Sequence, residues 1–310
     1  MILTVTLNAA VDKRYLVEQL TPQTVMRVRQ VTNTAGGKGL NVSRVAAMGG
    51  QEVTAMGFVG GWNGRLLESL LTERAITKAF THIQAPTRCC INVWDAAAGR
   101  STEFLEPGSP VTQEDAAAFV SDYEARLPLA DVVVLSGSLP QGLPVTFYDL
   151  LTTLAKQQGR PVLVDTSGAA LQSVAKAKPT FLKPNAEELR QLCGEAATGW
   201  EQLTAAAKRL QAGGVAIVAV SLGKHGVLVA CEEGVYHGIT PDLPVVNTVG
   251  CGDSMVAGFA VGMANGWSIA DTIHYAVCVS TANTMDHRTG YYKQEDLDRV
   301  RPLVRVERLA

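Results

Sequence analysis

The stretch from Asn247 to Phe259 contains the residues best suited to chemistry, and it reads Asn-Thr-Val-Gly-Cys-Gly-Asp-Ser-Met-Val-Ala-Gly-Phe. Gly250 and Gly252 leave backbone amides uncovered where an apolar helical pattern begins. The amides and the positive dipole end of such a helix N-terminus suit a phosphate or a developing phosphoryl charge. Asp253 lies in the first turn, where a carboxylate either caps the helix or accepts a hydroxyl proton beside the anion. From this stretch alone, both roles stay open.

A second glycine-rich turn precedes a helical pattern near the start of the chain, in Thr34-Ala-Gly-Gly-Lys-Gly-Leu-Asn-Val-Ser-Arg. It is not a Walker A loop, because Gly39 follows Lys38 where that motif has Ser or Thr. An ordinary tight turn remains an alternative for this piece alone. Residues 13–44 carry six basic side chains against one acidic, whereas the whole chain balances 27 Lys and Arg against 29 Asp and Glu. Most of these cations fit a solvated surface, and a few fit the neutralisation of an anionic ligand.

The order and separation of these two stretches resemble the paired signatures of the ribokinase-like (pfkB-type) carbohydrate kinases, and the similarity extends over nearly the whole chain. Ala9 stands where the family usually has Pro, and Cys251 where it usually has Ala or Ser, but neither departure removes a functional side chain. The motifs are most similar to the phosphosugar branch, which includes tagatose-6-phosphate kinase and 1-phosphofructokinase. The intervening motifs are Leu7-Asn-Ala-Ala-Val-Asp, Thr87-Arg, Ser136-Gly-Ser-Leu-Pro, Lys183-Pro-Asn-Ala-Glu-Glu and Ser221-Leu-Gly-Lys-His-Gly.

The resemblance implies an ATP- and Mg²⁺-dependent kinase that phosphorylates a ketohexose monophosphate. D-tagatose 6-phosphate, converted to the 1,6-bisphosphate, is the first expectation. Fructose 1-phosphate and fructose 6-phosphate are the alternative substrates. A non-catalytic regulator that binds sugar or nucleotide on the same fold is the alternative outside the enzymes, and the presence of Asp253, Gly250 and Gly252 argues against it.

The resemblance also implies roles for individual residues. Asp253 would be the base, and the amides of Gly250, Cys251 and Gly252 would stabilise the transferring phosphoryl group. Arg88 offers a planar fork suited to the sugar's phosphate. Asn185 and Glu188 equally fit a helix capping box, so that role stays open beside the implied one. The implied substrate site is Asp12, Gly37, Lys38, Asn41, Arg88, Ser138 and, more weakly, Arg27; the implied ATP site is Asn185, Ser221, Gly223, Gly226 and Asn283, with Glu188 binding Mg²⁺ through water.

The elements that would position these residues follow from the hydrophobic pattern. Helical patterns with capping boxes begin at Thr112 and Ser268. Continuous apolar runs between helices are typical of a parallel sheet covered on both faces, which predicts an α/β fold. With the resemblance, we expect a three-layer sandwich with a mostly parallel sheet. The predicted strands are Ile2–Leu7, Val53–Phe58, Val132–Leu135, Val162–Asp165, Phe181–Lys183 and Val215–Val220.

Two segments, at about 13–34 and 87–107, interrupt this pattern because polar and apolar residues partly alternate in them, as in Val25–Val31 and Arg88–Trp94. We expect them to form a small β-sheet lid inserted into a single domain that spans 1–310. By the resemblance, the lid would also clasp a second copy of the chain in a homodimer. The apolar positions for that contact are Val25, Val28, Cys90, Ile91 and Trp94.

The composition limits the partners and the compartment. A formal net charge of −2 argues against a nucleic-acid-binding protein. The six cysteines form no Cys-x-x-Cys pair, which is typical of free thiols in a reducing compartment. The N-terminal residues do not resemble a signal peptide, and no apolar run approaches the ~20 residues of a membrane span. We therefore expect a cytoplasmic protein without a membrane partner.

Overall fold

The computed structural model describes residues 1–194 and 199–309, and its main sheet has eleven strands in the order β15-β14-β13-β12-β11-β10-β9-β1-β4-β5, with β6 paired to β4. The strands from β5 to β12 are parallel, and β12 to β15 form an antiparallel extension. The strands are β1 Ile2–Thr6, β4 Val53–Gly60, β5 Ile76–Lys78, β6 Thr81–Ile83, β9 Val132–Ser136, β10 Val162–Asp165, β11 Phe181–Leu182, β12 Ile217–Ser221, β13 Val227–Cys231, β14 Gly234–Ile239 and β15 Arg305–Arg308.

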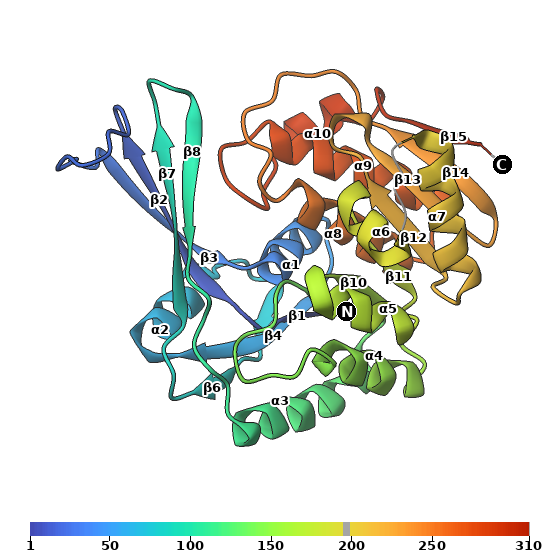
Figure 1. Cartoon of the computed structure of the whole chain (residues 1–310), viewed down its shortest axis with the longest axis horizontal. Helices are drawn as coiled ribbons and strands as arrows, with labels where there is room; N and C mark the ends of the chain where they lie inside the picture. The colour runs from blue at the N-terminus through green and yellow to red at the C-terminus, as the bar shows by residue number, and fades with distance from the viewer. Residues whose placement is uncertain (195–198, 310) are drawn as a thin grey trace.

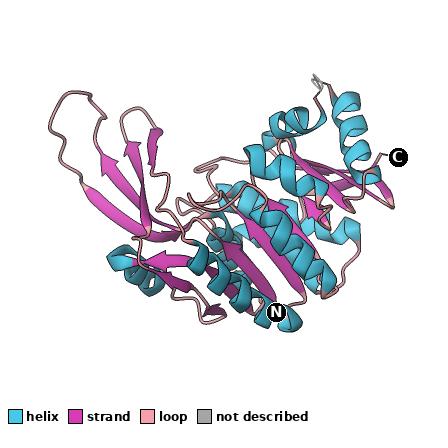
Figure 2. Ribbon diagram, turned by 60° about the horizontal axis from the view of Figure 1, so that its bottom comes forward, coloured by secondary structure: helices cyan, strands magenta, loops and turns pink. Residues whose placement is uncertain are grey.

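Helices cover both faces of this sheet, which makes a three-layer sandwich (Figures 1 and 2). One hydrophobic cluster joins the sheet to α1, α2, α8, α9 and α10, and a second joins its other face to α3 through α7. The helices are α1 Lys38–Met48, α2 Gly61–Leu70, α3 Gln113–Arg126, α4 Phe147–Gln157, α5 Gly168–Lys176, α6 Ala186–Cys193, α7 Trp200–Ala212, α8 Cys251–Ala264, α9 Ile269–Thr284 and α10 Gln294–Val300, with short 3₁₀ turns η1 Leu127–Leu129 and η2 Gly223–His225.

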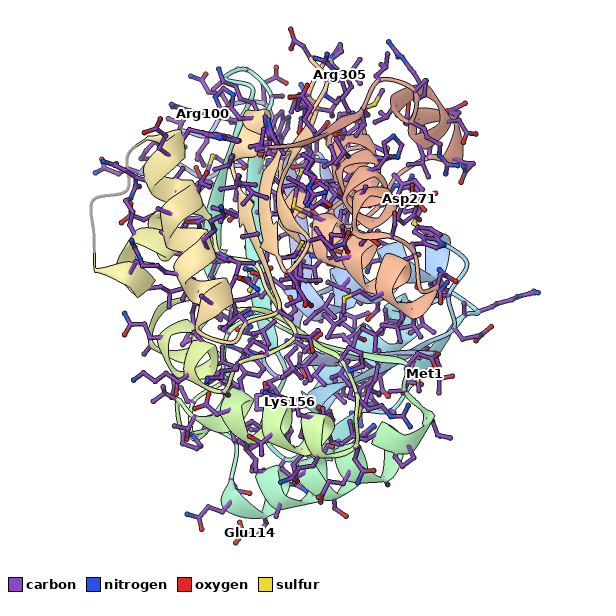
Figure 3. All side chains as sticks on the ribbon, turned by 90° about the vertical axis from the view of Figure 1, so that its right-hand side faces the viewer. Met1, Arg100, Glu114, Lys156, Asp271 and Arg305 are labelled. Carbon is purple, nitrogen blue, oxygen red and sulfur yellow. The ribbon has the colours of Figure 1, made fainter. Side chains whose placement is uncertain are left out.

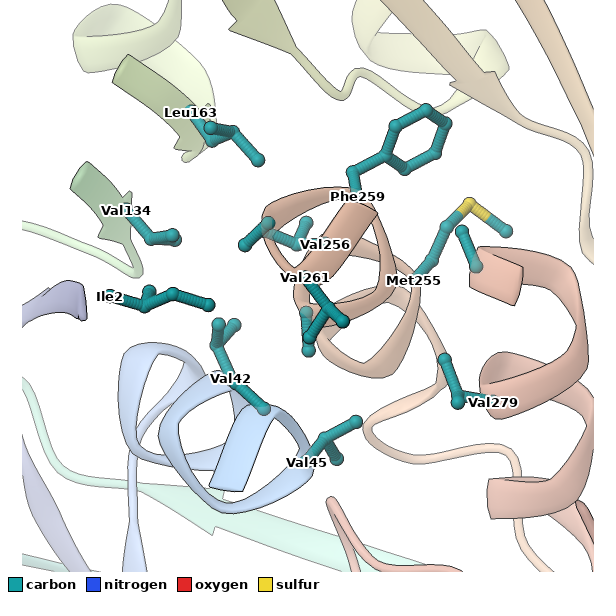
Figure 4. Packing of buried hydrophobic residues seen from close by; sticks show 14 of the residues in the cluster. Ile2, Val42, Val45, Val134, Leu163, Met255, Val256, Phe259, Val261 and Val279 are labelled. Atoms are coloured by element: carbon teal, nitrogen blue, oxygen red, sulfur yellow. The ribbon is translucent and has the colours of Figure 1, made fainter. Parts of the chain in front are cut away.

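Helices α1 and α8, which begin at the two glycine-rich turns, pack side by side on the sheet (Figure 4). Val42 and Val45 of α1 face Val256 and Val261 of α8, and these side chains are at most 1% exposed. Burying each such side chain contributes roughly 1.5–3 kcal/mol, so the contact fixes the two helix starts relative to each other.

A second sheet stands apart from the sandwich (Figure 1), and its strand order is β3-β2-β7-β8. Figure 3 places Arg100, at the start of β8, far from Glu114 at the start of α3. The strand expected through Val25 is wrong, because the chain begins to pair with β2 only at Gln30 and the residues before it connect β2 to β3. The strands are β2 Ala10–Val17, β3 Gln30–Gly36, β7 Arg88–Asp95 and β8 Arg100–Leu105.

The α/β fold and all six predicted strands of the main sheet are confirmed, with ends that shift by at most two residues. The Thr112 capping box is also confirmed. Thr112 Oγ1 accepts from the amide of Asp115 at 3.1 Å, and Asp115 Oδ2 accepts from the amide of Thr112 at 3.2 Å. The antiparallel extension β13–β15 was not predicted. Among the residues that the structure describes, no helix combines the length and the apolar character required to cross a membrane.

Candidate active site

A cavity of about 1010 Å³ opens between the lid sheet and the carboxyl ends of the parallel strands. Strands β1 and β9 are neighbours in the sheet, and the chain continues from β1 to β4 on one side and from β9 to β10 on the other. Such a switch point is where open α/β sheets bind ligands. The cavity brings together nine of the predicted site residues. They are Asp12, Gly37, Lys38, Asn41, Arg88, Ser138, Gly250, Gly252 and Asp253.

The turn at Gly250 forms the N-terminus of the 14-residue helix α8. Gly250 has a φ of +83°, and a Cβ there would lie 2.8 Å from the amide nitrogen of Gly290. Only glycine therefore fits without strain. The first amides of a helix have no intrahelical acceptor, so this turn presents donors and a positive dipole end to the cavity.

Cys251 and Asn283 support this turn from behind, and neither is among the residues that line the cavity. The Cys251 amide, which was expected to bind the phosphoryl group, already donates a long hydrogen bond of 3.4 Å to the carbonyl of Thr248. Asn283 is fully buried, and its Nδ2 donates to the carbonyl of Val249 at 3.1 Å while its Oδ1 accepts from Ser254 Oγ at 3.2 Å. These bonds show that Asn283 supports the turn, and its expected place beside the adenine pocket stays a prediction.

Asp253 is a buried acid of the cavity. It is 6% exposed, and its Oδ2 accepts from Nδ2 of Asn41 at 2.8 Å. Burial, and next the Asp165 carboxylate, raise the pKa of Asp253 to about 6, against the lowering effect of Lys38, the Asn41 amide and Lys183. A carboxylate whose pKa approaches neutrality is a better proton acceptor than an exposed one and is still ionised at pH 7.

Two lysines flank the glycine turn and share one buried carboxylate. Lys38 Nζ lies 3.4 Å and Lys183 Nζ 3.3 Å from Oδ1 of Asp165, which is 1% exposed. Lys183 is also the nearest group to Gly252, at 3.4 Å from where a Cβ would be. Burial tends to lower the pKa of Lys38, but Asp165 and other nearby carboxylates raise it overall. The cluster keeps a net positive charge beside the turn.

Sequence reasoning missed Asp165 and assigned Lys183 no role. A signal was present, because both stood at the carboxyl end of predicted parallel strands, where ligands bind.

The opposite part of the cavity suits sugar hydroxyls. Burial raises the pKa of Asp12 to about 6, although the Arg88 and Arg44 cations lower it. A Cβ at Gly36 would lie 2.1 Å from the Asp12 carboxyl group, so this glycine makes room for the acid. Nearby, Asn8 Nδ2 donates to Ser138 Oγ at 3.0 Å; sequence reasoning named Ser138 as a site residue but missed Asn8.

Arg88 lines the cavity, but part of its guanidinium group is hydrogen-bonded to backbone carbonyls. Nε and one Nη atom donate to the carbonyl of Asn8 at 3.1 and 2.9 Å, and the other Nη donates to the carbonyl of Glu106 at 2.7 Å. Two of the five N–H groups of a guanidinium then remain for a phosphate. Arg27, by contrast, is exposed in the connection between β2 and β3 and is not among the cavity-lining residues.

The residues expected to bind ATP border a different part of the strand ends. Asn185 and Ser221 form a parallel β-bridge, and Asn185 and Glu188 form the capping box of α6 with two bonds of 2.8 Å. Gly223 is exposed, with a φ of +58°. A Cβ on Gly226 would lie 1.9 Å from the carbonyl oxygen of Gly238 in β14, so its lack of a side chain serves packing.

The sequence model for pfkB family carbohydrate kinases matches residues 2–295. The chain belongs to this kinase family. It is 37% identical over 303 residues to tagatose-6-phosphate kinase of Staphylococcus epidermidis, with 97% of each chain covered. The homologues are sugar-phosphate kinases, in agreement with the resemblance of the motifs.

Solved structures agree with this assignment. Phosphofructokinase-2 of Escherichia coli in complex with fructose-6-phosphate has a TM-score of 0.90 at 27% identity, covering 97% of this kinase and 98% of that chain. The same enzyme is described in a tetrameric inhibited form, with a TM-score of 0.89, 28% identity and the same coverage. Ribokinase of Arabidopsis thaliana complexed with ribose and ATP, with a TM-score of 0.73 at 20% identity over 96% and 97% of the two chains, shares the fold.

Proposed function

We propose that this kinase transfers the γ-phosphoryl group of ATP to a ketohexose monophosphate, with D-tagatose 6-phosphate as substrate and the 1,6-bisphosphate as product. The observation that carries the reaction is the position of the Asp253 carboxylate in the first turn of α8, beside the bare glycine amides. The relative of Staphylococcus epidermidis, which is named for tagatose 6-phosphate, supports the choice of sugar.

The proposed reaction uses the chain's own groups in a simple order. Asp253 accepts the proton of the sugar's 1-hydroxyl while that oxygen bonds to the γ-phosphorus and the bond from phosphorus to the ADP oxygen breaks. The amides of Gly250 and Gly252, with the Lys38 and Lys183 ammonium groups, stabilise the negative charge on the transferring phosphoryl group. Asp12 accepts hydrogen bonds from other hydroxyls and fixes the sugar's orientation.

The sugar's own phosphate would bind at the remaining N–H groups of Arg88, at the edge of the cavity near Asn8 and Ser138. A charge-assisted, two-point contact distinguishes a phosphate from a hydroxyl group. This contact favours a sugar phosphate over a free sugar as the substrate.

Mg²⁺ would accompany ATP. The residues present fit an ion that is bound mainly by the ATP phosphates and water better than one bound by protein side chains alone. No cluster of three metal-binding side chains occurs in the part of the chain that is described. Mg²⁺ commonly takes only one or two carboxylates together with substrate phosphates and water. Glu188 has one oxygen in the α6 cap and the other available for the water around the ion. When bound, the ion neutralises charge on the phosphates.

Two further properties belong to the proposal. All six thiols are free, which supports a reducing, cytoplasmic setting. The lid exposes apolar side chains, with Val25 94%, Val31 53% and Phe104 59% exposed, which supports a dimer through the lid. Three residues expected in that contact, Cys90, Ile91 and Trp94, line the cavity instead. A monomer by light scattering at micromolar concentration would contradict the dimer.

The test is a comparison of kcat/KM on D-tagatose 6-phosphate, fructose 1-phosphate and fructose 6-phosphate with ATP and Mg²⁺. The proposal predicts the highest value for D-tagatose 6-phosphate. A higher value for either fructose phosphate would move the assignment to that kinase. No ADP formation with any of the three would favour a non-catalytic regulator.

A further inference from the structure

Arg44 of α1 is a buried cation that the proposed reaction does not use. It is 8% exposed, and a guanidinium stays protonated at any pH at which proteins fold. A buried charge is costly unless it is paired and hydrogen-bonded. Its Nε donates to Glu73 Oε1 at 3.1 Å, and its Nη2 donates to the carbonyl of Ala35 at 2.9 Å. Its Nη1 donates to the carbonyl of Thr289 and to Oδ1 of Asn41, both at 3.2 Å.

The bond to Asn41 fixes which way the Asn41 amide faces. Arg44 can only donate, and an ionised Asp253 can only accept. The amide oxygen must therefore face Arg44, and the NH₂ group must face Asp253, where it donates to Oδ2 at 2.8 Å. The reversed amide would place donor against donor on one side and acceptor against acceptor on the other. Among the bonds described, this is the only hydrogen bond from α1 to the proposed base, and Arg44 determines its direction.

We propose that Arg44 is a positioning residue that fixes the Asn41 amide so that its NH₂ group donates to the Asp253 carboxylate. This inference rests on the proposed function, because it assumes that Asp253 is the base. The core contact between α1 and α8 sets the distance between the two side chains (Figure 4), and Arg44 sets the polarity of the bond between them.

The surroundings of Asp253 define the expected effect. The Asn41 amide donates to Asp253, and the charged groups near Asp253 are Lys38, Lys183 and Asp165. The charge of Asp253 also raises the pKa of Asp12. None of these charged residues contacts Arg44 through a hydrogen bond in the described part of the chain. A hydrogen bond to an ionised carboxylate favours the charged form, so loss of the correctly oriented amide raises the pKa of Asp253.

The experiment measures kcat against pH for the wild type and for Arg44→Lys with saturating D-tagatose 6-phosphate and ATP. The single ammonium group of lysine cannot reach all four acceptors of the guanidinium in their present positions, so we expect the Asn41 amide to lose its fixed orientation. The acidic limb of the profile should move up by about one pH unit, since a protonated base is inactive. Arg160→Lys is the matched control, because Arg160 donates to the carbonyl of Pro128 at 2.8 Å and precedes β10, at the opposite end of the strand from the cavity. Its profile should match the wild type.

A double-mutant cycle separates positioning from general support. Asn41→Ala alone should shift the limb upward, and Arg44→Lys should add no further shift in that background. A further shift there, or an Arg44→Lys profile equal to that of Arg160→Lys, would overturn the inference. If Arg44→Lys does not fold, Arg44→Gln takes its place, and failure of both to fold would assign Arg44 a structural role and overturn the inference too. A wild type without an acidic limb would instead contradict Asp253 as the base.

Discussion

Asn41 and Asp253, 212 positions apart in the chain, are joined by a buried hydrogen bond of 2.8 Å between the amide nitrogen of one and Oδ2 of the other. Each residue lies in the first turns of a helix that begins at a glycine-rich turn. The two turns that sequence reasoning singled out therefore meet in one cavity.

The pH dependence of turnover should report the base. Burial raises the pKa of Asp253 to about 6. Below that pH the carboxyl group is protonated and cannot accept the sugar's proton, so kcat should fall about tenfold for each pH unit. The measurement is kcat at saturating substrates between about pH 4 and pH 8. A flat acidic side would contradict the assignment.

Removing the charge of Asp253 should stabilise the fold at neutral pH. The folded pKa of about 6 exceeds the ordinary value of 3.8, so the folded state binds the proton more tightly than the unfolded state does. Stability therefore falls as pH rises from about 4 to about 6 and stays lower above that window. Asp253→Asn should raise the free energy of unfolding by about 1–3 kcal/mol at pH 7 and by much less near pH 4. Urea titrations at both pH values measure this, and equal effects at both would contradict it.

Arg88→Lys should weaken the binding of the sugar's phosphate. Lysine cannot hold the Asn8 and Glu106 carbonyls and also offer a planar pair of donors. Loss of a charge-assisted bond of about 1.5–3 kcal/mol should raise the KM for the sugar phosphate roughly 10- to 100-fold. The KM for ATP should change little. An equal rise in both KM values would indicate a general loss of the lid instead of a phosphate contact.

Lys183→Met should lower kcat more than it raises either KM. The ammonium group lies beside Gly252 and shares Asp165 with Lys38, so its charge should act mainly on the developing phosphoryl charge. A loss of about 10- to 100-fold in kcat is expected from one preorganised cation. Lys156→Met is a control, since Lys156 is exposed on α4 and donates to the carbonyl of Lys178 at 2.8 Å. If the two variants behaved alike, Lys183 would have no role in transfer.

Local sequence patterns were sufficient for the parts of the fold that depend on local physics. Val162–Asp165 reads as a buried strand and is one, and the Thr112 and Asn185 capping boxes form with the expected partners. Glycines mark the turn at Gly250 because a side chain there would be strained. These features depend on neighbours only a few residues away.

The parts that sequence did not reveal depend on contacts between distant segments. Asn283 could not be assigned to the support of the glycine turn, because its partners Val249 and Ser254 are about 30 residues away along the chain. The pairing of Lys183 with Asp165 and the hydrogen bond from Arg44 to Asn41 likewise appear only when strands and helices are assembled. The lid's apolar residues alternate, but alternation alone does not say which face meets the cavity.

The most direct test of the central claim is the turnover of Asp253→Asn with D-tagatose 6-phosphate, ATP and Mg²⁺, measured beside the affinity for the sugar phosphate. Asp271→Asn is the matched control, because Asp271 also lies in the first turn of a helix but is exposed and away from the cavity. The account predicts that Asp253→Asn binds the sugar phosphate with near-normal affinity and loses about 10²- to 10⁴-fold in kcat, while the control keeps its activity. A kcat for Asp253→Asn within a few-fold of the wild type would contradict Asp253 as the base.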